Sequence, residues 1–324
     1  MGNEAQFLIM KKSLLQMLMI VALIAQTSKA QTITENFGSG TNAFSIDFVT
    51  IGNPGNVADT TGAPNPAGSV NYYYNIGKYE VSRDQIIKAN LDGGLGITLS
   101  DMSSYGANGG NMPATGISWL EAAKYVNYLN TSHGSSVAYK ISGNQFTPWG
   151  STEIGYNPNN NFRNTLAKFF LPTVDEWYKA AYGTPNGNWY KYSTGSDTAP
   201  TVVDQGTDPN TAVWNNRNSP APIDNAGGLS PYGTMAQGGN VFEWNETISP
   251  NNNSANVDYL IIRGGAWGYG IGAATLDSSS LSHGYISLEY EFHGFRVASV
   301  PEPSALSLLS ISLGGLAMVR RRRS

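Results

Sequence analysis

The sequence over residues 238–298 decides the fold, because it concentrates glycines, aromatics and charges in three short motifs. They read GGNVFEWNE at 238–246, IIRGGAW at 261–267 and HGFRVA at 293–298. Glycine reaches backbone angles that other residues avoid and lets a neighbouring strand approach closely. Each buried aromatic contributes roughly 150–250 Å² of buried area. Charges between such aromatics need partners once they are buried. We therefore predict a β-core in which Glu243, Arg263 and Arg296 tie strands and loops together.

Upstream of this stretch, three capping boxes predict helix starts. In a capping box, a hydroxyl and a Glu or Gln three residues later satisfy each other's backbone donors. The boxes are Ser82–Gln85, Ser118–Glu121 and Thr173–Glu176. The second helix keeps an apolar face at the 3.6 period and should end at Gly134. Residues 32–70 read as short strands with tight turns, and 135–168 and 184–237 as mostly loop. This pattern predicts an α+β domain.

Composition excludes several classes of protein. The formal charge of −4 and the pI near 5.4 argue against a nucleic-acid partner, which would favour a basic face. The chain contains no cysteine, which excludes disulfides, thiolate metal ligands and thiol nucleophiles together. A serine hydrolase is disfavoured, because Ser278–Ser280 and His283 lack a nucleophile elbow.

Residues 1–30 are predicted to be a signal peptide. Lys11 and Lys12 form its positive region, Leu14–Ala25 its apolar region and Ser28–Ala30 a small-x-small cleavage site. The apolar region is shorter than the roughly 20 residues that span a bilayer. We therefore expect an exported protein. Either Met1 or Met10 could be the start of translation.

Residues 300–324 are predicted to be a second targeting signal. Val300-Pro301-Glu302-Pro303 precedes an apolar stretch over 305–319 and then four arginines. As a helix, the apolar stretch reaches only about 22 Å, and the arginines favour the cytoplasmic side. The order resembles the PEP-CTERM sorting signal of Gram-negative bacteria. That resemblance implies an exosortase partner, transient membrane association through the C-terminal helix and delivery to the cell surface or matrix. A plain tail anchor is the alternative.

The three core motifs also resemble the formylglycine-generating enzyme (sulfatase-modifying factor) family, whose counterparts are GNVWEW, LRGGSW and GFR. Three further stretches match in the family's order. They are IGKYEVSRDQ at 76–85, PATGISWLEAAKYVNYLN at 113–130 and FFLPTVDEWYKAAYG at 169–183. The resemblance implies a C-type-lectin-like fold, with a small twisted antiparallel sheet and two or three helices. We assign it to one domain, residues 31–299.

The resemblance carries over the fold but not the family's oxidase activity. Formylglycine generation, as the family implies, uses two copper-binding cysteines beyond the GGSW motif and the serine of that motif. Here the serine is Ala266, and the cysteine positions fall near Tyr269 and Ala274. Neither of these side chains can bind copper through sulfur. We therefore expect no formylglycine-generating activity and assign no catalytic residue.

Other metals are conceivable. The resemblance implies a calcium site with the Glu243 carboxylate and the carbonyls of Gly239 and Val241 as ligands, which suits a hard cation. A further oxygen expected at position 236 is missing, since Ala236 stands there. Without calcium, Glu243 should accept backbone N–H groups or pair with an arginine. An iron site would need His283, His293 and a carboxylate from Asp277, Glu289 or Glu291.

Two functions follow from these observations. The first is an exported, surface- or matrix-associated, non-catalytic module that binds polysaccharide or a surface protein. Aromatics in loops suit sugar rings, and the resemblance places the ligand in a cleft. That cleft would be lined by Asn245, Glu246, Trp267, Tyr269 and Arg296. The alternative is a divergent metal-dependent oxidoreductase that uses His and carboxylate ligands.

Overall fold

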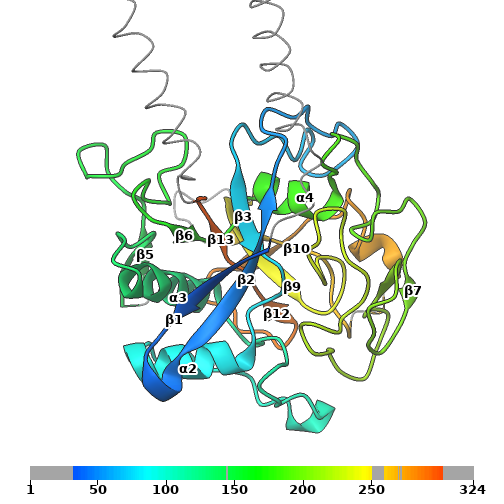
Figure 1. Ribbon diagram of the computed structural model, residues 1–324, viewed down its shortest axis with the longest axis horizontal. Helices are drawn as coiled ribbons and strands as arrows, with labels where there is room; N and C mark the ends of the chain where they lie inside the picture. The colour runs from blue at the N-terminus through cyan, green and yellow to red at the C-terminus, as the bar shows by residue number, and fades with distance from the viewer. Residues whose placement is uncertain (1–31, 144, 250–258, 269, 271, 302–324) are drawn as a thin grey trace, which may run out of the picture. The chain divides into compact units, whose positions relative to one another are not determined.

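The computed structural model describes residues 32–143, 145–249, 259–268, 270 and 272–301 (Figure 1). The predicted signal peptide, Tyr269 and the sorting segment beyond Pro301 lie outside this part of the chain. None of the helices in these residues is long and apolar enough to cross a bilayer.

Two sheets carry the domain. The first has five antiparallel strands in the order β1-β2-β3-β13-β6. Their bounds are β1 Thr32–Phe37, β2 Phe44–Ile51, β3 Tyr74–Gly77, β13 Ala298–Ser299 and β6 Phe169–Phe170. The second has four strands in the order β11-β10-β9-β12, in which only β12 and β9 are parallel. Their bounds are β11 Ser282–Tyr285, β10 Tyr259–Arg263, β9 Phe242–Ile248 and β12 His293–Gly294.

Smaller elements stand apart from the two sheets. Two short pairs are β4 Lys140–Ser142 with β5 Gln145–Thr147, and β7 Thr201–Val202 with β8 Thr211–Ala212. Single 3₁₀ turns are η1 Gly40–Asn42, η2 Ser103–Tyr105 and η3 Ala273–Thr275. Apart from these two strand pairs, the described residues of 135–168 and 184–237 are irregular or in turns, as the sequence predicts.

All three predicted helices form where the capping boxes place them. They are α2 Arg83–Gly93, α3 Trp119–Ser132 and α4 Val174–Tyr182. Each begins with both reciprocal hydrogen bonds of the box in place. Chain reversal after α3 uses Gly134 at φ 72°, in the left-handed region that glycine enters without steric cost. These starts were predictable because capping depends only on residues within one turn.

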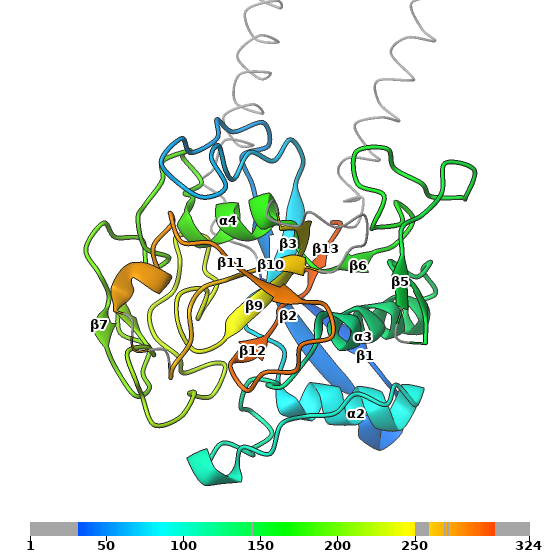
Figure 2. The same ribbon diagram turned by 180° about the vertical axis from the view of Figure 1, so that it is seen from behind.

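The main core lies between the first sheet and the helices. Along β2, Phe44, Ile46 and Phe48 are buried and Ser45 is exposed, the alternation that a half-buried strand requires. In both views α2 and α3 lie beside one end of the β1–β2 hairpin, and α4 lies near its other end (Figures 1 and 2). The loops around β7 lie on the opposite side from α3. The predicted α+β class is confirmed.

Candidate functional site

Two of the three charges of the core motifs, Glu243 and Arg296, pair with each other, which is one of the arrangements that the sequence allows for Glu243 without calcium. Glu243 on β9 accepts hydrogen bonds from Arg296 at both oxygens, Nε–Oε2 and Nη2–Oε1 each being 2.6 Å. Trp177 on α4 donates to the same carboxylate at 2.6 Å. Arg296 also donates to the carbonyls of Gly77 and Met235, each at 2.8 Å. This network joins the two sheets to α4.

The predicted calcium site does not fit these residues. Both oxygens of Glu243 already accept charge-assisted hydrogen bonds, so calcium would have to displace the arginine. A second carboxyl group, Glu80, lies beside the network and accepts from Asn240 Nδ2 at 2.6 Å and from the Val241 N–H at 3.2 Å. Burial and the neighbouring Glu243 raise the pKa of Glu80 well above its usual range. The cluster is therefore an internal ion pair with a weakly acidic neighbour.

Arg263, the third predicted charge, is also buried. Its guanidinium donates to the carbonyls of Ala63 and Ser278. It lies within 5.5 Å of the ring centres of three aromatics, Trp177, Tyr178 and Tyr182. Such cation–π contacts stabilise a desolvated guanidinium. Arg263 therefore holds the loop around residue 63 against α4.

The residues predicted to line one cleft lie in separate surroundings. Asn245 is fully buried, and both polar atoms of its amide lack a partner in the described part of the chain. Trp267 is 3% exposed and packs on Tyr105 and Phe292 at ring distances of 4.8 and 4.9 Å. Arg296 is engaged in the buried ion pair with Glu243. Of the four described cleft residues, Glu246 lines a groove at the surface.

This groove has a volume of about 990 Å³ and is formed by segments far apart in the sequence. Residues 69–72, 157–165, 173–175 and 246–248 line it together with Val300. We call it the Glu246 groove. It combines the loop before β3, the Asn-rich loop before β6, the start of α4 and the end of β9.

A fully paired ionic network forms the floor of the Glu246 groove. Arg163 lies between two carboxylates, 3.2 Å from Glu176 and 2.8 Å from Glu246. Its guanidinium stacks 3.7 Å from the ring centre of Phe170. Although burial alone would lower the pKa of Arg163, the two carboxylates raise it above its ordinary value. Burial also raises the pKa of Glu246, in spite of the arginine.

Neutral donors complete the coordination of the two carboxylates. Glu246 accepts from the Tyr139 hydroxyl at 2.7 Å and from Asn160 Nδ2 at 2.6 Å. Glu176 accepts from the Tyr72 hydroxyl at 2.7 Å and caps α4 through the Thr173 N–H at 2.7 Å. A carboxylate satisfied in this way is held rigidly. The floor is therefore a preorganised polar surface.

The walls offer unused hydrogen-bonding groups. The side-chain amides of Asn71, Asn159 and Asn161 form no hydrogen bond within the described residues. Tyr72 is 43% exposed, so its ring stands at the rim while its hydroxyl reaches the floor. Free amides beside an aromatic ring can bind a ligand that has both hydroxyl groups and an apolar face.

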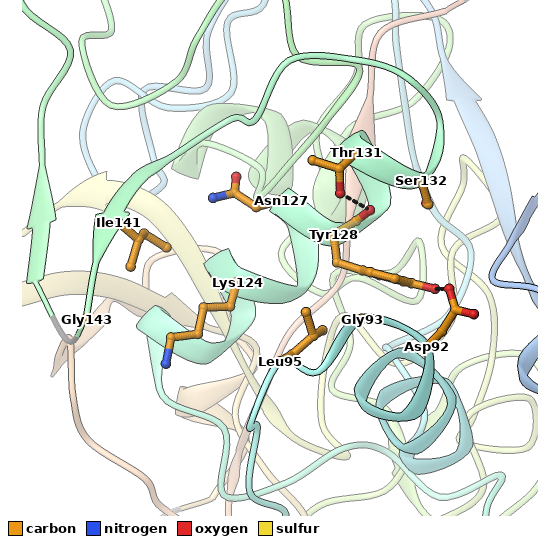
Figure 3. Close-up of a pocket in the computed structure, with 10 residues that line it drawn as sticks. All are labelled: Asp92, Gly93, Leu95, Lys124, Asn127, Tyr128, Thr131, Ser132, Ile141 and Gly143. Carbon is orange, nitrogen blue, oxygen red and sulfur yellow. Dashed lines mark hydrogen bonds between the residues drawn. The ribbon is translucent and has the colours of Figure 1, made fainter.

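A second pocket, of about 720 Å³, lies between the end of α2, α3 and β4 (Figure 3). Leu95 and Ile141 supply apolar surface there. Its polar groups largely bond to each other: Tyr128 donates to Asp92 at 2.8 Å, and Thr131 to the Tyr128 carbonyl at 3.0 Å (Figure 3). This pocket has fewer free polar groups than the Glu246 groove.

The histidines do not form the hypothesised iron site. His283 and His293 lie on β11 and β12, the two opposite edge strands of the second sheet, three strand spacings or about 14 Å apart. The His293 ring packs on Trp244 at 5.2 Å, whereas His283 packs on Tyr259 at 5.7 Å. His133 pairs instead with Glu35 at 3.2 Å. Across the described residues, no three His, Asp or Glu side chains gather as a metal site.

The sequence did not identify Arg163, Glu176 and Tyr139 as site residues. Arg163 stands in an Asn-rich stretch that predicts a solvated loop, and Glu176 was assigned to helix capping alone. The one local indication in the sequence is the segment 157–161, in which four of five residues are asparagine.

Comparisons with known proteins agree with this architecture. The family model of the sulfatase-modifying factor enzyme 1-like domain matches residues 43–300. Among solved structures, CarF is similar with a TM-score of 0.56 and 18% identity, over 79% of this chain and 99% of CarF. Treponema denticola variable protein 1 has a TM-score of 0.54 and 17% identity, over 84% and 100%. PvdO from Pseudomonas aeruginosa has a TM-score of 0.52 and 15% identity, over 85% and 100%.

At these identities, the likeness to solved structures establishes the fold. No curated protein matches the chain. The PEP-CTERM protein-sorting motif matches residues 299–323, which implies exosortase-type sorting of an exported protein. The extent of the domain match settles the family: the chain belongs to the family of the sulfatase-modifying factor enzyme 1-like domain.

Proposed function

We propose that this exported protein is a non-catalytic binding module that holds an extracellular polysaccharide in the Glu246 groove. The observation that supports it most is the combination of a rigid, fully paired floor with free amides and an exposed tyrosine on the walls. Sugar rings present hydroxyl groups at the rim and C–H groups on the face, so this lining complements them. The volume of about 990 Å³ leaves room for more than one ring.

The charges of the groove favour a neutral polysaccharide. Asp175 and Glu246 line the groove and the buried Glu176 lies behind it, so three carboxyl groups stand against the single guanidinium of Arg163. Burial raises the pKa of Asp175, which reduces the charge but leaves no excess positive group. An acidic polysaccharide would meet like charge in a partly desolvated groove. A neutral polysaccharide meets no such penalty.

The replacement of the family's reactive residues supports a binding role. The chain has no cysteine, and Ala266, buried at 1% exposure, stands where the family motif has serine. The alternative oxidoreductase would need ligands for a redox metal, and the two histidines considered for it lie on opposite edges of a sheet. No specific observation favours that alternative. We propose the cell surface or extracellular matrix as the location, since the sorting motif accompanies the domain.

Isothermal titration with oligosaccharides from neutral and acidic bacterial exopolysaccharides would test this proposal. The Tyr72→Ala protein should lose about two- to twelvefold in affinity for the neutral ligand, since one aromatic contact is worth about 0.5–1.5 kcal/mol. Tyr73→Ala is the matched control, because Tyr73 is 56% exposed and does not line the groove. Equal affinity of both variants, or preference for acidic chains, would contradict the proposal.

A further inference from the structure

The C-terminal strand of the domain is central to the fold. β13 lies between β3 and β6, with Ala298 opposite both Ile76 and Phe170. The two residues of β13 and the three that precede it are at most 1% exposed; they are Phe295, Arg296, Val297, Ala298 and Ser299. This strand therefore cannot leave the sheet without breaking two ladders and uncovering the core.

The backbone stays attached up to the start of the sorting segment. Val300 N–H donates to the Lys168 carbonyl at 3.0 Å, so the chain is held one residue beyond β13. The sorting motif matches from residue 299, inside the strand itself. Pro301 is the first residue after these contacts, and it opens the Pro-Glu-Pro sequence. The folded domain and the motif are thus joined without a linker.

The N-terminus has the opposite arrangement. β1 begins at Thr32, directly after the predicted signal peptide, but it is an edge strand that pairs only with β2. Four of its first five residues are exposed or half-buried polar side chains. Of its six residues only Phe37 belongs to the core, so late pairing of β1 would uncover less of the core than late docking of residues 295–299. A signal peptidase acting before residue 31 therefore competes less with the folded core than an enzyme acting at the C-terminus.

Proteins that bind an extended peptide as an added strand do so through hydrogen bonds to the peptide backbone. In the folded domain, the backbone groups of residues 298–300 on the N-terminal side of Pro-Glu-Pro already pair with β3, β6 and Lys168. We propose that the sorting enzyme engages this chain before β13 docks into the sheet, because folding of the domain makes the backbone of residues 298–300 inaccessible. Sorting and completion of the fold then compete in time.

The test uses the full chain, expressed in a host that contains the sorting enzyme and followed by pulse-chase. Processing is read as conversion to the shorter form, and folding as resistance of the domain to added protease. In the wild type, conversion should occur early and stop once the chain becomes protease-resistant. Inserting six Gly and Ser residues between Val300 and Pro301 should allow conversion to continue in the resistant form, several-fold faster than in the wild type.

The same insertion between Pro185 and Asn186, in an exposed turn, is the matched control and should behave as the wild type. Protease resistance of each variant shows whether the domain still folds. If wild-type chains that are already resistant were processed as fast as newly made chains, the proposal would be overturned. An insertion after Val300 that does not change the processing rate of resistant chains would overturn it as well.

Discussion

Arg296 and Glu243 form a two-point ion pair in which both side chains are completely buried, with N–O distances of 2.6 Å. Glu243 belongs to the second sheet, and Arg296 lies between β12 of that sheet and β13 of the first. The pair is thus a cross-link between the two sheets, and Trp177 attaches α4 to it. The Glu243 carboxylate, which the family resemblance assigns to calcium, forms this internal link instead.

Removing one partner of this pair should destabilise the domain strongly. Arg296→Met leaves the Glu243 carboxylate buried without its cation, which costs about 3–5 kcal/mol in comparable proteins. Lys88→Ala is the control, because Lys88 and Asp84 form a partly exposed pair within α2, worth less than about 0.5 kcal/mol. Urea denaturation monitored by tryptophan fluorescence measures the free energy of unfolding of both variants. Similar losses in the two variants would show that the buried pair has no special role.

His293 should make the domain sensitive to acid. Burial lowers the pKa of His293 from 6.5 to about 4. Between these values the unfolded chain binds a proton that the folded chain does not, so stability falls as the pH falls from 6.5 to 4. The shift corresponds to at most about 3.4 kcal/mol. His293→Phe keeps a ring against Trp244 and should flatten this part of the stability profile, as measured by denaturation at pH 7, 5.5 and 4.5. A slope equal to that of the wild type would refute the assignment.

Gly239 should not tolerate a side chain. It has a φ of 102°, and an added Cβ would lie 2.5 Å from the Val213 carbonyl oxygen. Gly239→Ala should therefore cost about 1–3 kcal/mol. At Gly109, an added Cβ would meet Met112 at an ordinary 3.6 Å, so Gly109→Ala should change stability by less than about 0.5 kcal/mol. Thermal denaturation of the two variants makes the comparison, and equal midpoints would count against this backbone geometry.

Metal ions should neither be retained in stoichiometric amounts nor stabilise the protein. The Glu243 oxygens are occupied by Arg296 and Trp177, and His283 is separated from His293 by two strands. Mass spectrometry of residues 31–300, purified without chelator, should find less than one equivalent of iron, copper or calcium. Adding calcium or EDTA should leave the Tm unchanged, because only an ion that binds the folded state raises it. One equivalent of iron would revive the oxidoreductase hypothesis.

Features that depend on neighbours in the sequence were predictable. The three capping boxes located α2, α3 and α4, because each box satisfies its donors within one turn. The pairing of Glu243 with an arginine was also foreseen as the alternative to calcium, since a charge between two buried aromatics needs a partner. The sequence does not say which arginine, because β9 and residue 296 meet only through the sheet.

The Glu246 groove could not be predicted, since its parts meet only in the folded chain. Tyr72, Arg163 and Glu176 come from a loop, an Asn-rich stretch and the first turn of a helix. Nothing in the spacing of these residues indicates that two glutamates share one guanidinium. The cleft implied by the family resemblance included Glu246, but it also included Asn245, which the structure buries completely.

Hydrogen exchange with and without the neutral oligosaccharide tests most directly whether the Glu246 groove is the binding site. Saturating ligand should slow amide exchange in residues 69–72 and 157–165, which line the groove, by mass spectrometry of peptic peptides. Residues 92–95 and 124–132, which line the pocket of Figure 3, should exchange as in the free protein. Protection of the latter segments alone, or of neither set at saturation, would contradict the account.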